Sequence, residues 1–204
     1  MSYVVAIAGP VGSGKSSLAG ALVKQLRDAA MVRFDHYEDI TRKTPGELVQ
    51  WMQDGADIDR FAFPELVRDL EKLKRGESVA DPVTHEIVEP RKYIVFEMPF
   101  GRAHAATAPF VDRLLWIDIP LDIALARKLR EHAGSFLNET PPDRHQERLI
   151  WLYGYVDSYL AFVHDILLVQ HDKVRPGADL LLDGLTDPES MSLAAERFVR
   201  TELP

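Results

Sequence analysis

The sequence predicts an α/β fold in which a parallel sheet carries helices on both of its faces. Short apolar runs rich in β-branched residues alternate along the chain with longer stretches in which apolar residues recur at helical spacing. The apolar runs are continuous, which is typical of strands that are buried on both faces. The 204 residues suffice for one sizeable core, so we expect a single domain over residues 1–204.

The predicted elements follow one another in a strand–helix order. Strands are expected at 3–8, 31–34, 93–97, 113–119 and 178–183. Helices are expected at 17–26, 45–52, 64–75, 121–132, 143–164 and 188–199. The fifth of these helices contains Gly154, where we expect a break. The polar, proline-bounded stretch 77–91 predicts a small hairpin outside the main sheet.

Composition narrows the class of protein. The net charge of −8 argues against general binding to nucleic acid or to anionic membranes, which needs a basic surface. Cysteine is absent, which excludes disulfides, thiolate catalysis and cysteine-based zinc sites. We find no signal segment and no apolar run that approaches the length needed to span a bilayer. We therefore expect a cytoplasmic protein with neither nucleic acid nor membrane as a partner.

The junction between the first strand and the first helix carries the strongest functional signal. Residues 9–16 read Gly-Pro-Val-Gly-Ser-Gly-Lys-Ser and fit the phosphate-loop pattern G-x-x-x-x-G-K-[ST]. The glycines let backbone N–H groups face phosphate oxygens, and the helix N-terminus adds partial positive charge. Lys15 is expected to reach the β- and γ-phosphates, and the Ser16 hydroxyl to bind Mg²⁺. The structural alternative is a glycine-rich turn with a chance lysine.

The motif in this context predicts a three-layer P-loop NTPase fold that binds a nucleoside triphosphate. The predicted nucleotide-binding residues are Gly9, Pro10, Val11, Gly12, Ser13, Gly14, Lys15, Ser16 and Ser17.

Acidic residues at strand ends are the next candidates, because ligands of parallel sheets bind beyond the carboxyl ends of the strands. Asp35 follows the second strand and is expected to orient an acceptor hydroxyl and take its proton. An Asx turn or helix cap is the structural alternative. Glu97 ends its strand and is expected to serve Mg²⁺ together with Ser16. Asp118 competes for this role, but Asp118-Ile-Pro reads as a helix entry.

A cluster of cations follows on the helix after Asp118. Arg127 and Arg130 are three residues apart, so they lie on one face, and Lys128 is beside them. A cationic lid over 120–140 would close on the triphosphate and neutralise charge in the transition state, whereas a solvated basic face is the structural alternative. Asp57 and Asp59 are weaker candidates for holding substrate hydroxyls, since a solvated acidic loop explains them at least as well.

Taken in order, these segments resemble the uridine kinase and phosphoribulokinase family of P-loop kinases. The resemblance rests on the phosphate loop, Asp35-His-Tyr, the helix at 63–76, the hairpin at 82–86, the strand at 94–97, the Arg-x-x-Arg at 127–130 and the loop at 171–179. It implies ATP as donor, Mg²⁺, a small-molecule acceptor and, often, a homo-oligomer. It also implies Asp35 as the base, and Lys15, Arg127 and Arg130 in phosphoryl transfer. The expected substrate contacts are Asp35, Tyr37, Asp57, His85 and Arg102.

Departures from the family pattern bear on the acceptor. Met98-Pro99 follows Glu97 where the family has glycine, and the hairpin is short and lacks aromatic and arginine residues after Thr84-His85. A nucleoside is the leading acceptor. The alternative acceptors, which the same catalytic residues would serve, are pantothenate, ribosylnicotinamide, a sugar phosphate and glycerate. The alternative to a kinase is a non-catalytic regulatory protein that binds ATP. A GTPase is disfavoured, because no N-K-x-D segment occurs in the sequence.

Overall fold

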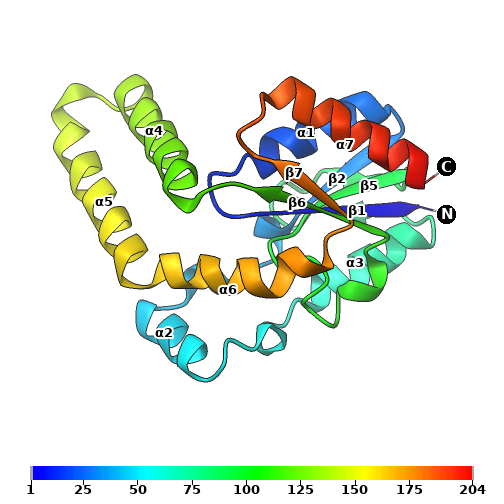
Figure 1. Ribbon diagram of the computed structural model, residues 1–204, viewed down its shortest axis with the longest axis horizontal. Helices are drawn as coiled ribbons and strands as arrows, with labels where there is room; N and C mark the ends of the chain where they lie inside the picture. The colour runs from blue at the N-terminus through cyan, green and yellow to red at the C-terminus, as the bar shows by residue number, and fades with distance from the viewer. Residues whose placement is uncertain (1, 204) are drawn as a thin grey trace.

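Five parallel strands form the central sheet of the computed structural model, which describes residues 2–203 apart from the side chain of Thr41 (Figure 1). The strand order is β2-β5-β1-β6-β7. The bounds are β1 (Tyr3–Ala8), β2 (Ala29–Arg33), β5 (Tyr93–Glu97), β6 (Arg113–Asp118) and β7 (Leu180–Asp183). The predicted sheet with helices on both faces is therefore confirmed, with β1 at its centre.

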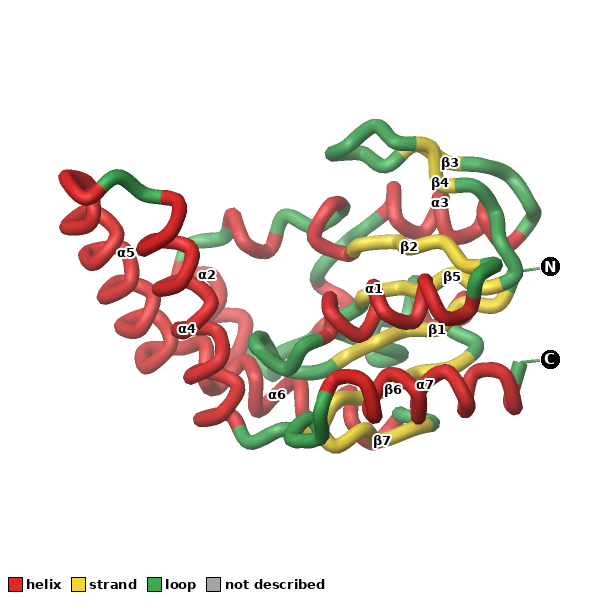
Figure 2. The backbone as a smooth tube through the Cα atoms, turned by 90° about the horizontal axis from the view of Figure 1, so that it is seen from above, coloured by secondary structure: helices red, strands yellow, loops and turns green. Residues whose placement is uncertain are grey.

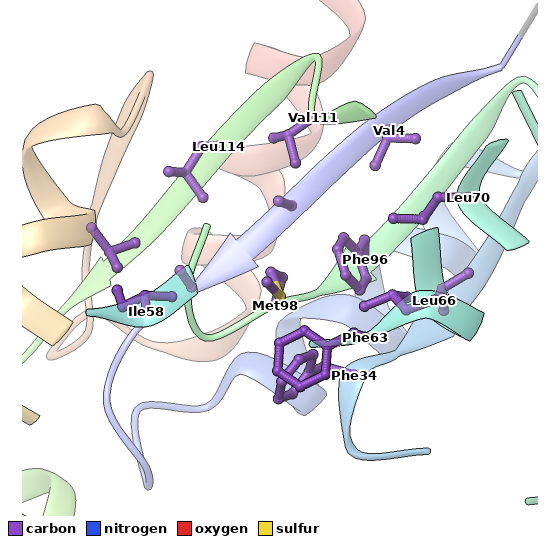
Figure 3. Close-up of a cluster of buried hydrophobic side chains, with 14 of the residues drawn as sticks. Val4, Phe34, Ile58, Phe63, Leu66, Leu70, Phe96, Met98, Val111 and Leu114 are labelled. Atoms are coloured by element: carbon purple, nitrogen blue, oxygen red, sulfur yellow. The ribbon is translucent and has the colours of Figure 1, made fainter. Parts of the chain in front are cut away.

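The two faces of the sheet are covered by different helices, as Figure 1 shows. On one side lie α1 (Lys15–Leu26) and α7 (Pro188–Glu202), which bury Val5 and Ile7 of β1. On the other side lie α3 (Pro64–Lys74) and α6 (His164–Val174). There Val4 packs in a cluster that includes Phe34, Leu66, Leu70, Phe96 and Met98 (Figure 3). The continuous apolar run of β1 thus reflects burial on both faces.

The helices between β6 and β7 form a projecting arm. α4 (Leu121–Glu139) leaves the sheet edge, and α5 (His145–Ser158) returns beside it (Figures 1 and 2). A π-helical turn at Tyr159–Val163 then leads into α6. The predicted break at Gly154 is wrong, because α5 continues through it and the irregular turn comes five residues later. A lone glycine does not end a helix that neighbouring contacts support.

The remaining elements are α2 (Pro45–Gln53), which contacts the π-helical turn at Tyr159–Val163, and a small hairpin beside β2. α2 begins with a capping box, in which Thr44 and Glu47 exchange hydrogen bonds. β3 (Val79–Ala80) and β4 (Ile87–Val88) form the predicted small antiparallel hairpin, outside the main sheet and near β2 (Figure 2). Short 3₁₀ helices occupy most of the intervening loops; one of them, Phe34–His36, follows β2 directly.

One continuous helical stretch bears on the membrane expectation. The stretch Pro142–Gly177 is long and apolar enough, by length and composition, to cross a membrane, and 17% of its most apolar window is buried. The statement that no apolar run approaches this length is therefore wrong. Much of this stretch is exposed rather than buried in the core. Its exposed large side chains include Leu149, Ile150, Tyr153 and Leu160. A cytoplasmic location stays a prediction.

Candidate active site

The register of the sheet aligns the strand ends that carry the candidate residues. Glu97, at the end of β5, pairs with Ile7 of β1 on one side and with Arg33 of β2 on the other. Gly9 follows Ile7 by two residues, and Asp35 follows Arg33 by two residues. The phosphate loop, Glu97 and Asp35 are therefore brought to one edge of the sheet, where ligands of this fold class bind.

The phosphate loop wraps tightly between β1 and α1. Ser13 N–H donates to the Pro10 carbonyl oxygen at 3.1 Å, and α1 starts at Lys15 without a side-chain cap on its first turn. Gly12 has φ of 80°, and a Cβ at this position would lie 2.1 Å from the backbone oxygen of Ala124 on α4. Only glycine fits there. Uncapped N–H groups at the start of α1 are the donors that a phosphate needs.

Lys15 lies in the middle of the loop. Its Nζ donates to the carbonyl oxygens of Gly9 and Pro10, each at 2.9 Å. Burial lowers the pKa of Lys15, whereas the negative charges of Glu97 and Asp35 oppose that shift. Two carboxylates are thus close enough to the ammonium group to act on it electrostatically. The buried cation is a suitable partner for phosphate oxygens.

Ser16 and Glu97 form a pair of oxygen ligands. The Ser16 hydroxyl donates to Glu97 Oε1 at 2.9 Å. Hydroxyl and carboxylate oxygens are the donors that Mg²⁺ takes in phosphoryl-transfer sites, so these two residues fit the metal. Asp118 is engaged elsewhere: hydrogen bonds from Arg175 lower its pKa, and the Trp116 indole N–H also donates to it, at 3.3 Å. The geometry therefore favours Glu97 over Asp118 as the metal residue.

These groups share one cavity of about 530 Å³. It is lined by residues of the phosphate loop, by Glu97 and Asp35, and by Arg127 and Lys128 of α4. A second cavity, of about 630 Å³, lies near Trp116 and His171 and shares only Pro10 with the phosphate loop. We place the candidate active site in the first cavity, because it alone of the two contains both carboxylates and the loop lysine.

The two predicted lid arginines differ in position. Arg127 lines the cavity and donates to the Gly184 carbonyl oxygen at 2.8 Å. Arg130 is exposed and is not among the lining residues that the structure describes. Lys128 lines the cavity in its place and forms an ion pair with Glu131 at 2.8 Å. Helical spacing alone indicated the basic cluster but not which of its members faces the site.

Four of the predicted substrate residues are not brought to the cavity wall. Tyr37 donates to Asp69 at 3.3 Å, and burial followed by the charge of Asp69 raises its pKa. Asp57 accepts from its neighbour Asp59 N–H at 3.1 Å. His85 is exposed at the turn of the hairpin, with φ of 60°. For these residues a structural role explains the observed contacts.

Arg102 lies at the opposite edge of the sheet. Its guanidinium donates to the carbonyl oxygens of Val111, Asp112 and Gly177, which precede β6 and β7. It also pairs with Asp179 at 2.8 Å. The amino ends of the strands face away from the phosphate loop, so Arg102 is a structural residue, and its predicted substrate contact is not supported.

The structure adds cavity residues that sequence reasoning missed. They include Glu38, Trp51, Phe100, Glu131 and Gln170. Glu38 stands three residues after Asp35 but lies beyond the 3₁₀ helix Phe34–His36, so closeness in sequence was its only signal. Trp51 and Gln170 had none, because their helices reach the cavity through tertiary packing.

Comparisons with known proteins agree with this geometry. No protein-family model matches the chain. It is 29% identical to the uridine kinase of Haemophilus ducreyi in an alignment 144 positions long, which covers 62% of this chain and 65% of that enzyme, just under two thirds. It is 26% identical to the uridine kinase of Salmonella typhimurium in an alignment 149 positions long, which covers 65% of this chain and 69% of that enzyme.

Solved structures show the same fold. A protein from Bacillus stearothermophilus described as a possible uridine kinase superposes with a TM-score of 0.55 at 15% identity, covering 89% of each chain. A gluconokinase from Sinorhizobium meliloti superposes with a TM-score of 0.56 at 12% identity, covering 98% of this chain and 93% of that one. At these identities the likeness concerns the fold. The resemblance read from the motifs is confirmed: the chain is similar to uridine kinases over part of its length and has the fold of the P-loop kinases.

Proposed function

We propose that the chain is an ATP-dependent kinase that transfers the γ-phosphoryl group to a hydroxyl of a small molecule, with a nucleoside as the leading acceptor. The observation that carries the proposal is the meeting of Lys15, the Ser16–Glu97 pair and Asp35 in one cavity. The named activities of the relatives support the same reaction class. The preference for a nucleoside rests on the uridine kinases alone.

The residues fit Mg·ATP in three respects. The start of α1 has no side-chain cap, so its N–H groups are open to phosphate oxygens. Lys15 Nζ, which sits on two loop carbonyls, would move to phosphate oxygens. Ser16 and Glu97 would hold Mg²⁺. Bound Mg·ATP supplies the phosphoryl group and the divalent charge that neutralises it.

The chain's own residues would take the proton, stabilise the transferring group and limit access of water. Asp35 would accept a hydrogen bond from the acceptor hydroxyl and take its proton as the oxygen attacks the γ-phosphorus. Lys15 and Arg127 would stabilise the charge on the transferring group. Apolar side chains that line the same cavity, such as Phe34 and Ile58, would leave less room for water, which is the competing acceptor.

The test is a coupled assay of ADP release with Mg·ATP and a panel of acceptor alcohols. The panel contains uridine, cytidine, purine nucleosides, ribosylnicotinamide, pantothenate, ribulose 5-phosphate and glycerate. Strong stimulation by one acceptor establishes the kinase and names its substrate class. If ATP binds but no acceptor stimulates turnover, the proposal of a kinase for these alcohols fails and a regulatory ATP-binding role is favoured.

A further inference from the structure

One buried glutamine connects the phosphate loop with the segment that follows β5. Gln170 lies on α6, lines the cavity and is 7% exposed. Its Nε2 donates to the carbonyl oxygen of Pro99 at 2.7 Å and, over a longer distance of 3.4 Å, to that of Gly9. Pro99 follows Glu97 by two residues, and Gly9 opens the phosphate loop. A side chain from a distant part of the sequence thus joins the two segments on which the proposed nucleotide and metal groups lie.

The orientation of this amide group is determined by its two neighbours. Both are carbonyl oxygens, which accept hydrogen bonds and cannot donate them. If the amide were turned over, Oε1 would face two oxygens and both hydrogen bonds would be lost. In the observed orientation Oε1 is buried and has no hydrogen-bond partner among the described residues. An apolar side chain of similar size would avoid this unpaired oxygen, so the filling of space does not explain why a glutamine stands here.

The Gly9 carbonyl oxygen is shared with the lysine of the phosphate loop. Lys15 Nζ donates to it at 2.9 Å, and to the Pro10 carbonyl oxygen at the same distance. When ATP binds, the proposed contacts of Lys15 are with phosphate oxygens, so both carbonyl oxygens lose this donor. A buried carbonyl oxygen that loses its donor destabilises the complex, and this loss opposes nucleotide binding.

Each of the two carbonyl oxygens has a second donor. The Pro10 oxygen also accepts from the Ser13 backbone N–H, at 3.1 Å. The Gly9 oxygen also accepts from Gln170 Nε2, and this hydrogen bond is long enough to shorten once the lysine has left. The other hydrogen bond of Nε2, at 2.7 Å, keeps the amide nearby throughout. Both carbonyl oxygens therefore stay paired when the ammonium group moves to phosphate.

We infer that Gln170 is a positioning residue that releases Lys15 for the phosphate groups of ATP. It replaces the lysine as donor to the Gly9 carbonyl oxygen and so holds the first peptide group of the phosphate loop in place. Loss of Gln170 should therefore weaken the nucleotide-bound state more than the free state, in which Lys15 still pairs that oxygen. The inference rests on the proposed binding of ATP at the loop, but not on transfer to any alcohol.

The test is calorimetric binding of a non-hydrolysable ATP analogue with Mg²⁺ to the wild type and to Gln170→Met, which has a similar volume and no donor. We expect the affinity to fall by about tenfold, the effect of one buried carbonyl oxygen left unpaired.

Gln25→Met is the matched control. Gln25 also donates one hydrogen bond from Nε2, to Ser192 Oγ at 3.0 Å, and its buried Oε1 likewise has no partner among the described residues. It lies near the end of α1, away from the described lining of the cavity. The control should bind the analogue within about twofold of the wild type, because it is remote from the loop.

A double-mutant cycle separates this role from a merely structural one. In a Lys15→Ala background the lysine pairs the Gly9 oxygen in neither state, so Gln170→Met should change the affinity by less than about twofold. AMP gives a second comparison, because it lacks the β- and γ-phosphates that Lys15 is expected to reach. Gln170→Met should bind AMP as the wild type does. Urea unfolding of each variant measures stability separately.

The inference is overturned if Gln170→Met binds the ATP analogue as tightly as the wild type does. It is also overturned if the variant loses affinity equally for the analogue, for AMP and in the Lys15→Ala background, since that result indicates a general structural role. If Gln170→Met does not fold, Gln170→Leu is measured in the same way. A wild type that binds no Mg·ATP refutes both the kinase proposal and this inference, whereas binding without turnover on any alcohol refutes the kinase proposal alone.

Discussion

The two ends of the candidate site are built in different ways. The phosphate end comes mainly from eight consecutive residues, 9–16, whose backbone conformation largely creates the site. The acceptor end is assembled from the segment after β2, from α2 and the loop that follows it, from the loop after β5 and from α6, which meet only in the folded chain. A contiguous motif fixes chemistry locally, whereas an assembled wall can change its acceptor without changing the phosphate loop. The following predictions separate the two ends.

The largest effect is expected at the phosphate end. Lys15→Ala removes the cation at the centre of the loop and should lower kcat/KM by at least about 10³-fold, as expected for a charge that stabilises a transferring phosphoryl group. The coupled assay of ADP release measures this. Lys24→Ala, an exposed lysine in the last turn of the same helix, is the control and should retain activity. Equal activity of both variants would remove Lys15 from the mechanism.

A large but selective effect is expected at the acceptor end. Asp35→Asn keeps the size of the side chain and removes the base, so kcat should fall by about 10²- to 10⁴-fold while ATP affinity stays close to that of the wild type. Turnover and calorimetric ATP binding are measured together. Asp39→Asn, an exposed change four residues later, should retain turnover. A normal rate in Asp35→Asn would contradict its role as base.

A smaller effect distinguishes the two arginines of α4. Arg127 lines the cavity and Arg130 does not, so Arg127→Ala should lower kcat by about tenfold or more. Arg130→Ala should stay within about threefold of the wild type, since its side chain is exposed. Steady-state kinetics of the two variants show which of the two arginines contributes to phosphoryl transfer. A larger loss in Arg130→Ala would mean that α4 turns this residue inward during the reaction.

The smallest effect concerns the support of the acceptor end. Asp81 on the hairpin accepts from His36 Nδ1 at 2.6 Å, next to Asp35. Burial alone would raise the pKa of Asp81, but hydrogen bonds from Thr84 N–H, His36 and Val83 N–H lower it to about 2, against an ordinary value of 3.8. The carboxylate therefore stabilises the fold fully above about pH 4, and this contribution is lost as the pH falls through 2.

Urea unfolding of Asp81→Asn and wild type at several pH values measures that contribution. The difference in the free energy of unfolding should have its full value above about pH 4 and should shrink towards pH 2. Glu86→Gln, an exposed change on the same hairpin, should show no such pH dependence. A difference that stays constant with pH would mean that the Asp81 charge plays no part in stability.

The contrast between the two ends also explains what the sequence could predict. The sheet, α1, the phosphate loop and the approach of Asp35 and Glu97 follow from apolar runs, glycines and the geometry of parallel strands. The contributions of Trp51 and Gln170 could not be predicted, because they depend on how α2 and α6 pack. The substrate contact of Arg102 rested on the family resemblance alone, and the structure instead places its guanidinium on carbonyl oxygens that precede β6 and β7.

Gly12 has a mechanical consequence. Its missing side chain lets the backbone of α4 at Ala124 rest directly on the phosphate loop, in a space that a single carbon atom would fill. The first turn of α4, where the arm begins, is thereby held in contact with the phosphate loop. If the arm swings over the cavity, the hinge must lie beyond Ala124, because a pivot at the root would break this contact. One glycine thus allows the first turn of α4 to pack against the phosphate loop.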